Sequence, residues 1–136
     1  MKKLIILDYN RTLFDPINNK LFDDVVVNLK KIHKSGHKMI LISRLESTRL
    51  TSKELAAISK YFESIIFVKH KTPELFISLI GIFGEKPSNC ISLNDHMPEV
   101  KLIDKLGIKS YWLEPNDDES YRPRVGSVTE FTNIFC

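Results

Sequence analysis

The chain has 136 residues, of which 43% are apolar and 27% charged, and its formal net charge at pH 7 is +3. This length and composition predict one soluble domain over residues 1–136, which needs no disulfides or structural metals. No apolar run approaches the roughly 20 residues of a membrane span, so we expect a cytoplasmic protein without membrane partners. Cys90 and Cys136 have neither metal-ligand nor disulfide spacing. The basic residues are scattered, which makes nucleic-acid binding the least favoured function.

The first predicted element is a strand over residues 4–7, which are four consecutive apolar residues. Such a run is typical of a strand that is buried on both faces of a sheet. The run stops at Asp8. Ligands of open parallel sheets bind at the carboxyl ends of the strands, so Asp8 is a candidate for chemistry. The alternative is a structural role in a turn or at a helix N-terminus.

Buried strands then alternate with amphipathic helices along the rest of the chain. The second helix is expected to begin at a capping box, Thr51–Glu54, and the third at Thr72 with Pro73 in its first turn. We predict strands at 4–7, 39–42, 65–68, 90–93 and 110–113, helices at 22–35, 51–62, 72–83, 98–106 and 128–135, and a small hairpin or flap at 13–21.

This alternation predicts an α/β fold in which right-handed crossovers build a five-stranded parallel sheet with helices on both faces. We expect the strand order 5-4-1-2-3, a three-layer Rossmann-like arrangement. In that order the first strand lies between the second and the fourth. Its carboxyl end then lies at the topological switch point of the sheet, where ligands of such folds bind.

Polar residues follow four of the predicted strands. They are Asp8 with Asn10, Ser43, the run Lys69–Lys71, and Asp95. Two carboxylates that share a divalent cation, a hydroxyl group and a lysine are suited to binding a phosphoryl group and neutralising its charge during transfer. Each residue alone has a structural alternative, because Ser43 and Asp95 could cap helices and the lysines could be solvated. Their expected convergence favours a site.

At these residues the chain resembles the haloacid dehalogenase (HAD) superfamily of aspartate-nucleophile phosphatases and phosphotransferases, over nearly its whole length. The first motif of that family, Asp-x-Asp-x-Thr-Leu after a strand, is similar to Asp8–Leu13. The Ser or Thr of the second motif matches Ser43, and the acidic pair of the fourth matches Asp95 and Glu99. The third-motif lysine precedes a Pro-x-x-Phe helix start, which leaves Lys69, His70 and Lys71 as candidates. We favour Lys71.

The resemblance implies an aspartyl-phosphate mechanism with Mg²⁺ as cofactor, in which Asp8 attacks phosphorus. It also implies a role for each matching residue. The catalytic residues would be Asp8, Asn10, Ser43 and Lys71, and the substrate-binding residues would be Ser43, Arg44, Lys69 and Lys71. The metal-binding residues would be Asp8, Asn10 (through its backbone carbonyl), Asp95 and Glu99 (directly or through a metal-bound water).

The chain departs from the family pattern at Asn10. Phosphatases of the family usually have a second Asp there, which protonates the leaving group, and an amide cannot exchange that proton. Smaller departures are Arg11 and Asn94, where Gly is common. We therefore expect a Mg²⁺-dependent phosphatase whose activity is weakened. The alternative is a catalytically impaired regulatory module that binds phosphate or a nucleotide, and a receiver-like signalling domain fits less well because Lys69 stands at the receiver's phosphoacceptor position.

Neither segment in which the family inserts a cap domain is long enough here to hold one, so we expect an open site. Capless members of the family act on large substrates or borrow a neighbouring subunit as a lid. The expected partner is a phosphorylated substrate, either a small molecule or a macromolecule, and a homo-oligomer is left open.

Overall fold

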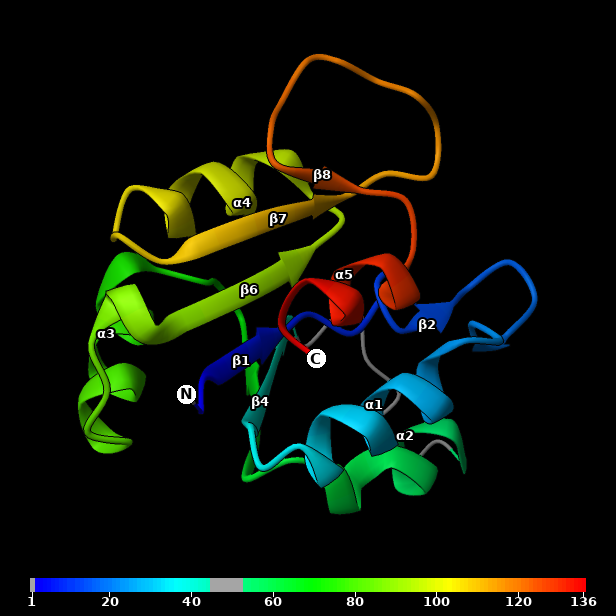
Figure 1. The fold of residues 1–136 in the computed structure, drawn as a ribbon, viewed down its shortest axis with the longest axis horizontal. Coiled ribbons are helices and arrows are strands. Elements are labelled where there is room, and N and C mark those ends of the chain that lie inside the picture. The colour runs from blue at the N-terminus through cyan, green and yellow to red at the C-terminus, as the bar shows by residue number, and fades with distance from the viewer. Residues whose placement is uncertain (1, 45–52) are drawn as a thin grey trace.

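The computed structural model describes residues 2–44 and 53–136 and contains a central parallel sheet (Figure 1). The sheet has six strands in the order β5-β4-β1-β6-β7-β8. Its strands are β1 (Leu4–Leu7), β4 (Lys38–Arg44), β5 (Ser64–Val68), β6 (Cys90–Asn94), β7 (Lys109–Leu113) and β8 (Arg124–Val125). The predicted flap is a separate antiparallel hairpin of β2 (Phe14–Asp15) and β3 (Lys20–Leu21).

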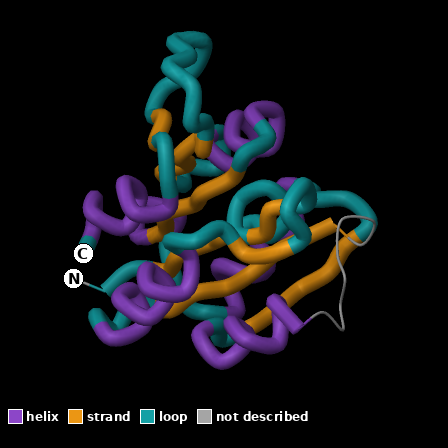
Figure 2. Tube along the Cα trace, turned by 90° about the vertical axis from the view of Figure 1, so that its right-hand side faces the viewer, coloured by secondary structure: helices purple, strands orange, loops and turns teal. Residues whose placement is uncertain are grey.

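The order of the five predicted strands is confirmed, and β1 lies between β4 and β6 as expected. The predicted number of strands is wrong, because β8 adds a sixth strand beside β7, with Leu113 opposite Val125. A strand of two residues is too short to show the periodicity on which sequence predictions rest. β8 returns the chain to the sheet after the long loop that projects from the molecule in Figures 1 and 2.

Helices cover both faces of the sheet, which gives the predicted three layers (Figure 2). They are α1 (Val25–Lys34), α2 (Lys53–Ile58), α3 (Pro73–Ile82), α4 (Met97–Asp104) and α5 (Val128–Phe135), with short 3-10 turns at Ser59–Tyr61 and Pro87–Asn89. Alternate residues of β1 point to opposite faces: Ile5 packs in the core under α1, α2 and α5, whereas Ile6 packs in the core under α3 and α4.

The helix boundaries show which local signals the fold uses. α3 is capped as predicted, because the Thr72 hydroxyl accepts a hydrogen bond from Leu75 N at 3.2 Å. α1 begins at Val25 and not at Phe22, whose N–H donates instead to Leu13 O in the flap. The predicted capping box at Thr51 and Ser52 lies outside the described residues. None of the described helices combines the length and apolar character that a membrane crossing requires.

Candidate active site

The carboxyl ends of β1, β4 and β6 meet at a small polar pocket of about 80 Å³. Asp8 follows β1 directly, and its backbone N–H donates to Leu93 O of β6 at 3.2 Å. This pairing holds the end of β1 beside the segment that follows β6. The residues that line this polar pocket are Asp8, Asn10, Arg11, Arg44, Asp95, His96 and Glu99.

A tight turn after β1 shapes one wall of the polar pocket. The Tyr9 carbonyl accepts hydrogen bonds from the backbone N–H groups of the three residues at positions 12–14, at 2.8 to 3.2 Å. Arg11 has a φ of 63°, a left-handed conformation that is rare for residues with a side chain. The turn also buries Thr12 completely, and the Thr12 hydroxyl donates to Asp95 Oδ1 at 3.3 Å. The turn therefore connects Asp8 to Asp95.

Lys71 supplies the positive charge closest to Asp8. Its Nζ lies 2.8 Å from Asp8 Oδ1 and 3.1 Å from Glu99 Oε2, and its side chain is only 3% exposed. None of the three candidates for this position lines the polar pocket, but Lys71 contacts two residues that do, whereas Lys69 and His70 are exposed. Of the three candidates, Lys71 is thus the one that the structure places against Asp8.

Glu99 is held by three neighbours. Lys71 contacts it as described, Asn94 Nδ2 donates to Glu99 Oε2 at 2.6 Å, and Arg44 Nε lies 3.6 Å from Glu99 Oε1. Burial favours the neutral form of Glu99, but the Lys71 charge and the Asn94 hydrogen bond outweigh it and hold the pKa of this carboxyl below its ordinary value. Glu99 therefore stays ionised and fixes the position of Lys71.

The surroundings of Asp95 shift its pKa in the direction opposite to that of Glu99. Burial, the neighbouring Asp8 carboxylate and a side-chain hydrogen bond with Asp8 raise the pKa of Asp95 from its ordinary value to about 7. Trp112 Nε1 donates to the backbone carbonyl of Asp95 at 3.0 Å, which fixes the segment in place. Two carboxyl groups are thus held side by side although their negative charges repel.

The pair formed by Asp8 and Asp95 fits a hard divalent cation. Carboxylate and carbonyl oxygens are the ligands that Mg²⁺ takes in proteins, usually one or two carboxylates with water and substrate oxygens completing its shell. The pKa of Asp95 is raised first by burial and then by the adjacent Asp8 charge, and a bound cation would neutralise that charge. Among residues 2–44 and 53–136, no group of three or more His, Cys, Asp or Glu side chains is placed to hold a metal ion.

Of the other predicted site residues, two line the polar pocket and one is buried away from it. Asn10 and Arg44 line the polar pocket. Ser43 is fully buried in β4, opposite Phe67 of β5, and is not among the lining residues. The predicted set also lacks four residues that the geometry brings to the site. These are Arg11 and His96 on the wall of the pocket, and Thr12 and Asn94, which hydrogen bond to its carboxylates.

A sequence signal existed for each of these four residues, although it was a weak one. Each is the immediate neighbour, or the near neighbour, of a motif carboxylate at the end of a strand. Position alone does not reveal which neighbours point into the pocket, because loop residues have no fixed periodicity.

No protein-family model matches the chain, and no curated protein matches it. Solved structures with a similar fold are an L-2-haloacid dehalogenase (TM-score 0.78, 9% identity, 98% of each chain covered) and a D,D-heptose 1,7-bisphosphate phosphatase from B. bronchiseptica in complex with magnesium and phosphate (0.74, 10%, 98% of this chain and 97% of that one). A third is a HAD phosphatase from Thermococcus onnurineus, with a TM-score of 0.70 and 18% identity. The match covers 84% of this chain and 57% of that one. The chain therefore has the HAD fold.

Proposed function

We propose that the protein is a Mg²⁺-dependent phosphohydrolase that acts on phosphate monoesters through an aspartyl phosphate on Asp8. The observation that carries this proposal is the placement of Asp8 between an almost fully buried lysine, Lys71 at 2.8 Å, and a second carboxyl group, Asp95. A nucleophilic carboxylate needs such charge neutralisation when it approaches the negatively charged phosphoryl group. The shared fold with solved phosphatases supports the same conclusion.

In the first step an Asp8 carboxylate oxygen bonds to phosphorus while the bond from phosphorus to the leaving oxygen breaks. Lys71 and Arg44 provide positive charge for the phosphoryl oxygens. Asp8, Asp95 and the backbone carbonyl of Asn10 would hold Mg²⁺, which supplies further charge neutralisation when bound. The leaving alkoxide takes a proton from solvent. In the second step water attacks phosphorus, inorganic phosphate leaves and the Asp8 carboxylate is regenerated.

Asn10 limits both steps, because an amide neither donates nor accepts the proton that an Asp at this position would transfer. General acid-base help is typically worth about a hundredfold to ten-thousandfold in rate. Leaving groups that need little protonation, such as phenols, therefore make better substrates than alkyl alcohols. The same residue is the observation that favours the alternative, a regulatory module that binds phosphate or a nucleotide without turning it over.

The proposal is tested by measuring release of phosphate from an aryl and an alkyl phosphate, with and without Mg²⁺. We expect Mg²⁺-dependent hydrolysis of the aryl ester, which Asp8→Asn reduces by three orders of magnitude or more, roughly the cost of removing a nucleophile. Turnover that survives in a folded Asp8→Asn variant would place the reaction elsewhere.

Asn10→Asp separates the enzyme from the regulatory module. Restoring the acid should raise kcat/KM for the alkyl phosphate by about a hundredfold or more and for the aryl phosphate by far less. Asn133→Asp, the same change at an exposed position on α5, should alter neither value. If a folded, metal-binding Asn10→Asp variant gains nothing with either ester, the regulatory module becomes the better description.

A further inference from the structure

A second, larger cavity opens beside the polar pocket. Its volume is about 290 Å³, and it shares two lining residues, Arg11 and Asp95, with the polar pocket. We refer to it as the side cavity. Small-molecule sites are usually about 300 to 1,000 Å³, so the side cavity suits a small organic group, whereas the polar pocket has room for little more than a phosphoryl group.

The walls of the side cavity are largely apolar, and the apolar residues come from three separate segments. Phe22 follows the flap, Leu113 ends β7, Pro115 begins the projecting loop and Val128 begins α5. Leu113 and Val128 are buried, whereas Pro115 lies exposed at the rim. Such walls bind the apolar body of a ligand, and an aromatic ring matches them in shape and polarity.

The charges around the side cavity are unequal. Two carboxylates, Asp24 and Glu114, line it in addition to Asp95, against a single guanidinium, that of Arg11. Asp24 Oδ2 accepts hydrogen bonds from Thr129 N and Oγ1 at 3.0 Å, and Glu114 Oε1 accepts from Asn116 N at 3.0 Å. Within the described part of the chain, the other oxygen of each carboxylate has no hydrogen-bond partner. These oxygens can accept bonds from ligand O–H or N–H groups and repel a ligand anion.

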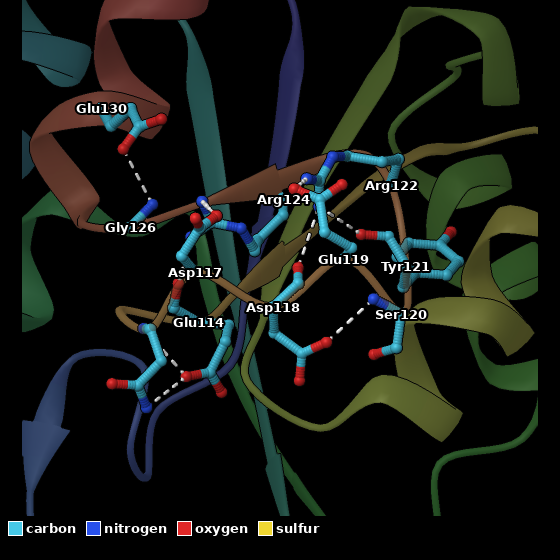
Figure 3. A network of polar contacts seen from close by, with 11 residues as sticks. Glu114, Asp117, Asp118, Glu119, Ser120, Tyr121, Arg122, Arg124, Gly126 and Glu130 are labelled. Carbon is cyan, nitrogen blue, oxygen red and sulfur yellow. Dashed lines mark hydrogen bonds and ion pairs between the residues drawn. The ribbon is translucent and has the colours of Figure 1, made fainter.

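The projecting loop is braced so that Glu114 keeps its position (Figure 3). Arg124 Nη1 donates to the Glu114 carbonyl at 2.6 Å, and Arg124 Nη2 lies 3.7 Å from Asp117 Oδ1. Further along the loop, Arg122 pairs with Glu119 at 2.7 Å. A carboxylate that is held in advance loses little conformational freedom when a ligand binds, which favours selectivity.

We propose that the side cavity binds the leaving group of the phosphate monoester and selects neutral or cationic single-ring leaving groups over anionic ones. This inference rests on the proposed function, because the phosphoryl group must occupy the adjoining polar pocket. Arg11 and Asp95 border both spaces, so the ester oxygen would lie near them and the organic group would extend toward Phe22 and Glu114. Esters with a second phosphate or a carboxylate are correspondingly disfavoured.

The test compares three aryl phosphates that differ in the charge of the ring substituent: tyramine phosphate (cationic), cresyl phosphate (neutral) and phosphorylated hydroxyphenylacetate (anionic). We expect kcat/KM to favour the cationic over the anionic ester by about tenfold or more, the effect of one partly buried charge. Glu114→Gln should lower this ratio about threefold. Glu119→Gln, the same change on the same loop but away from the side cavity, should leave the ratio unchanged.

Binding of the free alcohols, tyramine and hydroxyphenylacetate, measured by calorimetry, tests the side cavity without any turnover. Preference for tyramine that falls in Glu114→Gln supports the inference. Asp8-dependent turnover without charge preference, or a preference that Glu114→Gln leaves intact, overturns the inference alone. If none of the esters shows Asp8-dependent turnover, the proposed function falls, and the binding of the two alcohols then decides the selectivity of the side cavity by itself.

Discussion

The two ends of the central sheet use polar groups in opposite ways. At the amino end, Asn89 Nδ2 donates to the Lys2 carbonyl at 3.0 Å, and Lys3 N donates to His37 Nδ1 at 2.9 Å. Each of these bonds joins a neutral side chain to the backbone, and neither brings two like charges together. At the carboxyl end, Asp8 and Asp95 lie side by side, and the nearest cation is the buried Lys71.

From this difference we infer that the polar groups at the amino end stabilise the fold, whereas those at the carboxyl end serve the proposed chemistry. Hydrogen bonds between neutral groups contribute modestly to stability, and their donors and acceptors are already paired within the protein. Two adjacent carboxyl groups repel one another in the free protein, and a bound cation would relieve this repulsion. Perturbed carboxyl groups gathered in this way are typical of functional sites. Substitutions at the amino end should therefore change stability alone, whereas substitutions at the carboxyl end should also change activity.

The largest effect is expected from Lys71→Met at the carboxyl end. The change leaves Asp8 without its cation and Glu99 with Arg44 alone, and breaking a buried ion pair typically costs about 3 to 5 kcal/mol. We expect the free energy of unfolding in metal-free buffer to fall by about 3 kcal/mol, and kcat/KM to fall more than about a hundredfold. The exposed Lys69→Met should change both values little. Equal losses in the two variants would contradict the placement of Lys71.

The next effect is the pH dependence of stability that Asp95 causes. Because the pKa of Asp95 is raised to about 7 in the folded protein, the folded state binds this proton more tightly than the unfolded state does. In metal-free buffer this residue therefore makes stability fall as pH rises from about 4 to about 7, by at most about 1.4 kcal/mol per pH unit.

Denaturant titrations between about pH 4 and pH 7 measure the contribution of Asp95 to the free energy of unfolding. Asp95→Asn should remove the fall relative to the unmodified chain, and millimolar Mg²⁺ should reduce it. Asp104→Asn, a matched change at an exposed position of α4, should keep it. An unchanged profile in Asp95→Asn would mean that the two carboxyl groups do not share charge as the structure indicates.

A smaller effect is expected at the amino end from His37→Leu. The side chain is 7% exposed, and its loss leaves the Lys3 N–H without its acceptor, which typically costs about 1 to 3 kcal/mol. Burial and the nearby Lys2 charge lower the pKa of His37, so its contribution is lost as pH falls below about 6.5. kcat/KM should not change. The exposed His33→Leu serves as the control, and a loss of activity in His37→Leu alone would contradict the division between the two ends.

The smallest effect is expected from Arg11→Gly. A left-handed φ of 63° costs an ordinary residue about 1 to 2 kcal/mol, and glycine avoids this cost but loses more backbone entropy on folding. We expect the free energy of unfolding to rise by no more than about 1 kcal/mol. A clear fall in thermal or denaturant stability would show that the Arg11 side chain stabilises the fold through its contacts.

The sequence was sufficient to predict the five main strands, their order and the meeting of Asp8 with Asp95. These follow from strong local signals, because buried strands read as apolar runs and parallel strands end at one edge. The two-residue strand β8 carried no such signal. The sequence favoured Lys71 but left Lys69 and His70 open, because side-chain directions in a loop depend on the tertiary structure. The side cavity was also beyond prediction, since its walls come from segments far apart in the chain.

The central place of β1 also has a consequence for folding. β1 is the first strand of the sheet along the chain, yet one of its two neighbours, β6, begins only at Cys90. During synthesis, one edge of this four-residue apolar strand lacks its partner until most of the chain has been made. Closing so long a loop is slow, since its entropy must be lost before the contact forms. The same pairing of β6 with β1 brings Asp95 beside Asp8, so we expect the candidate active site to form late in folding.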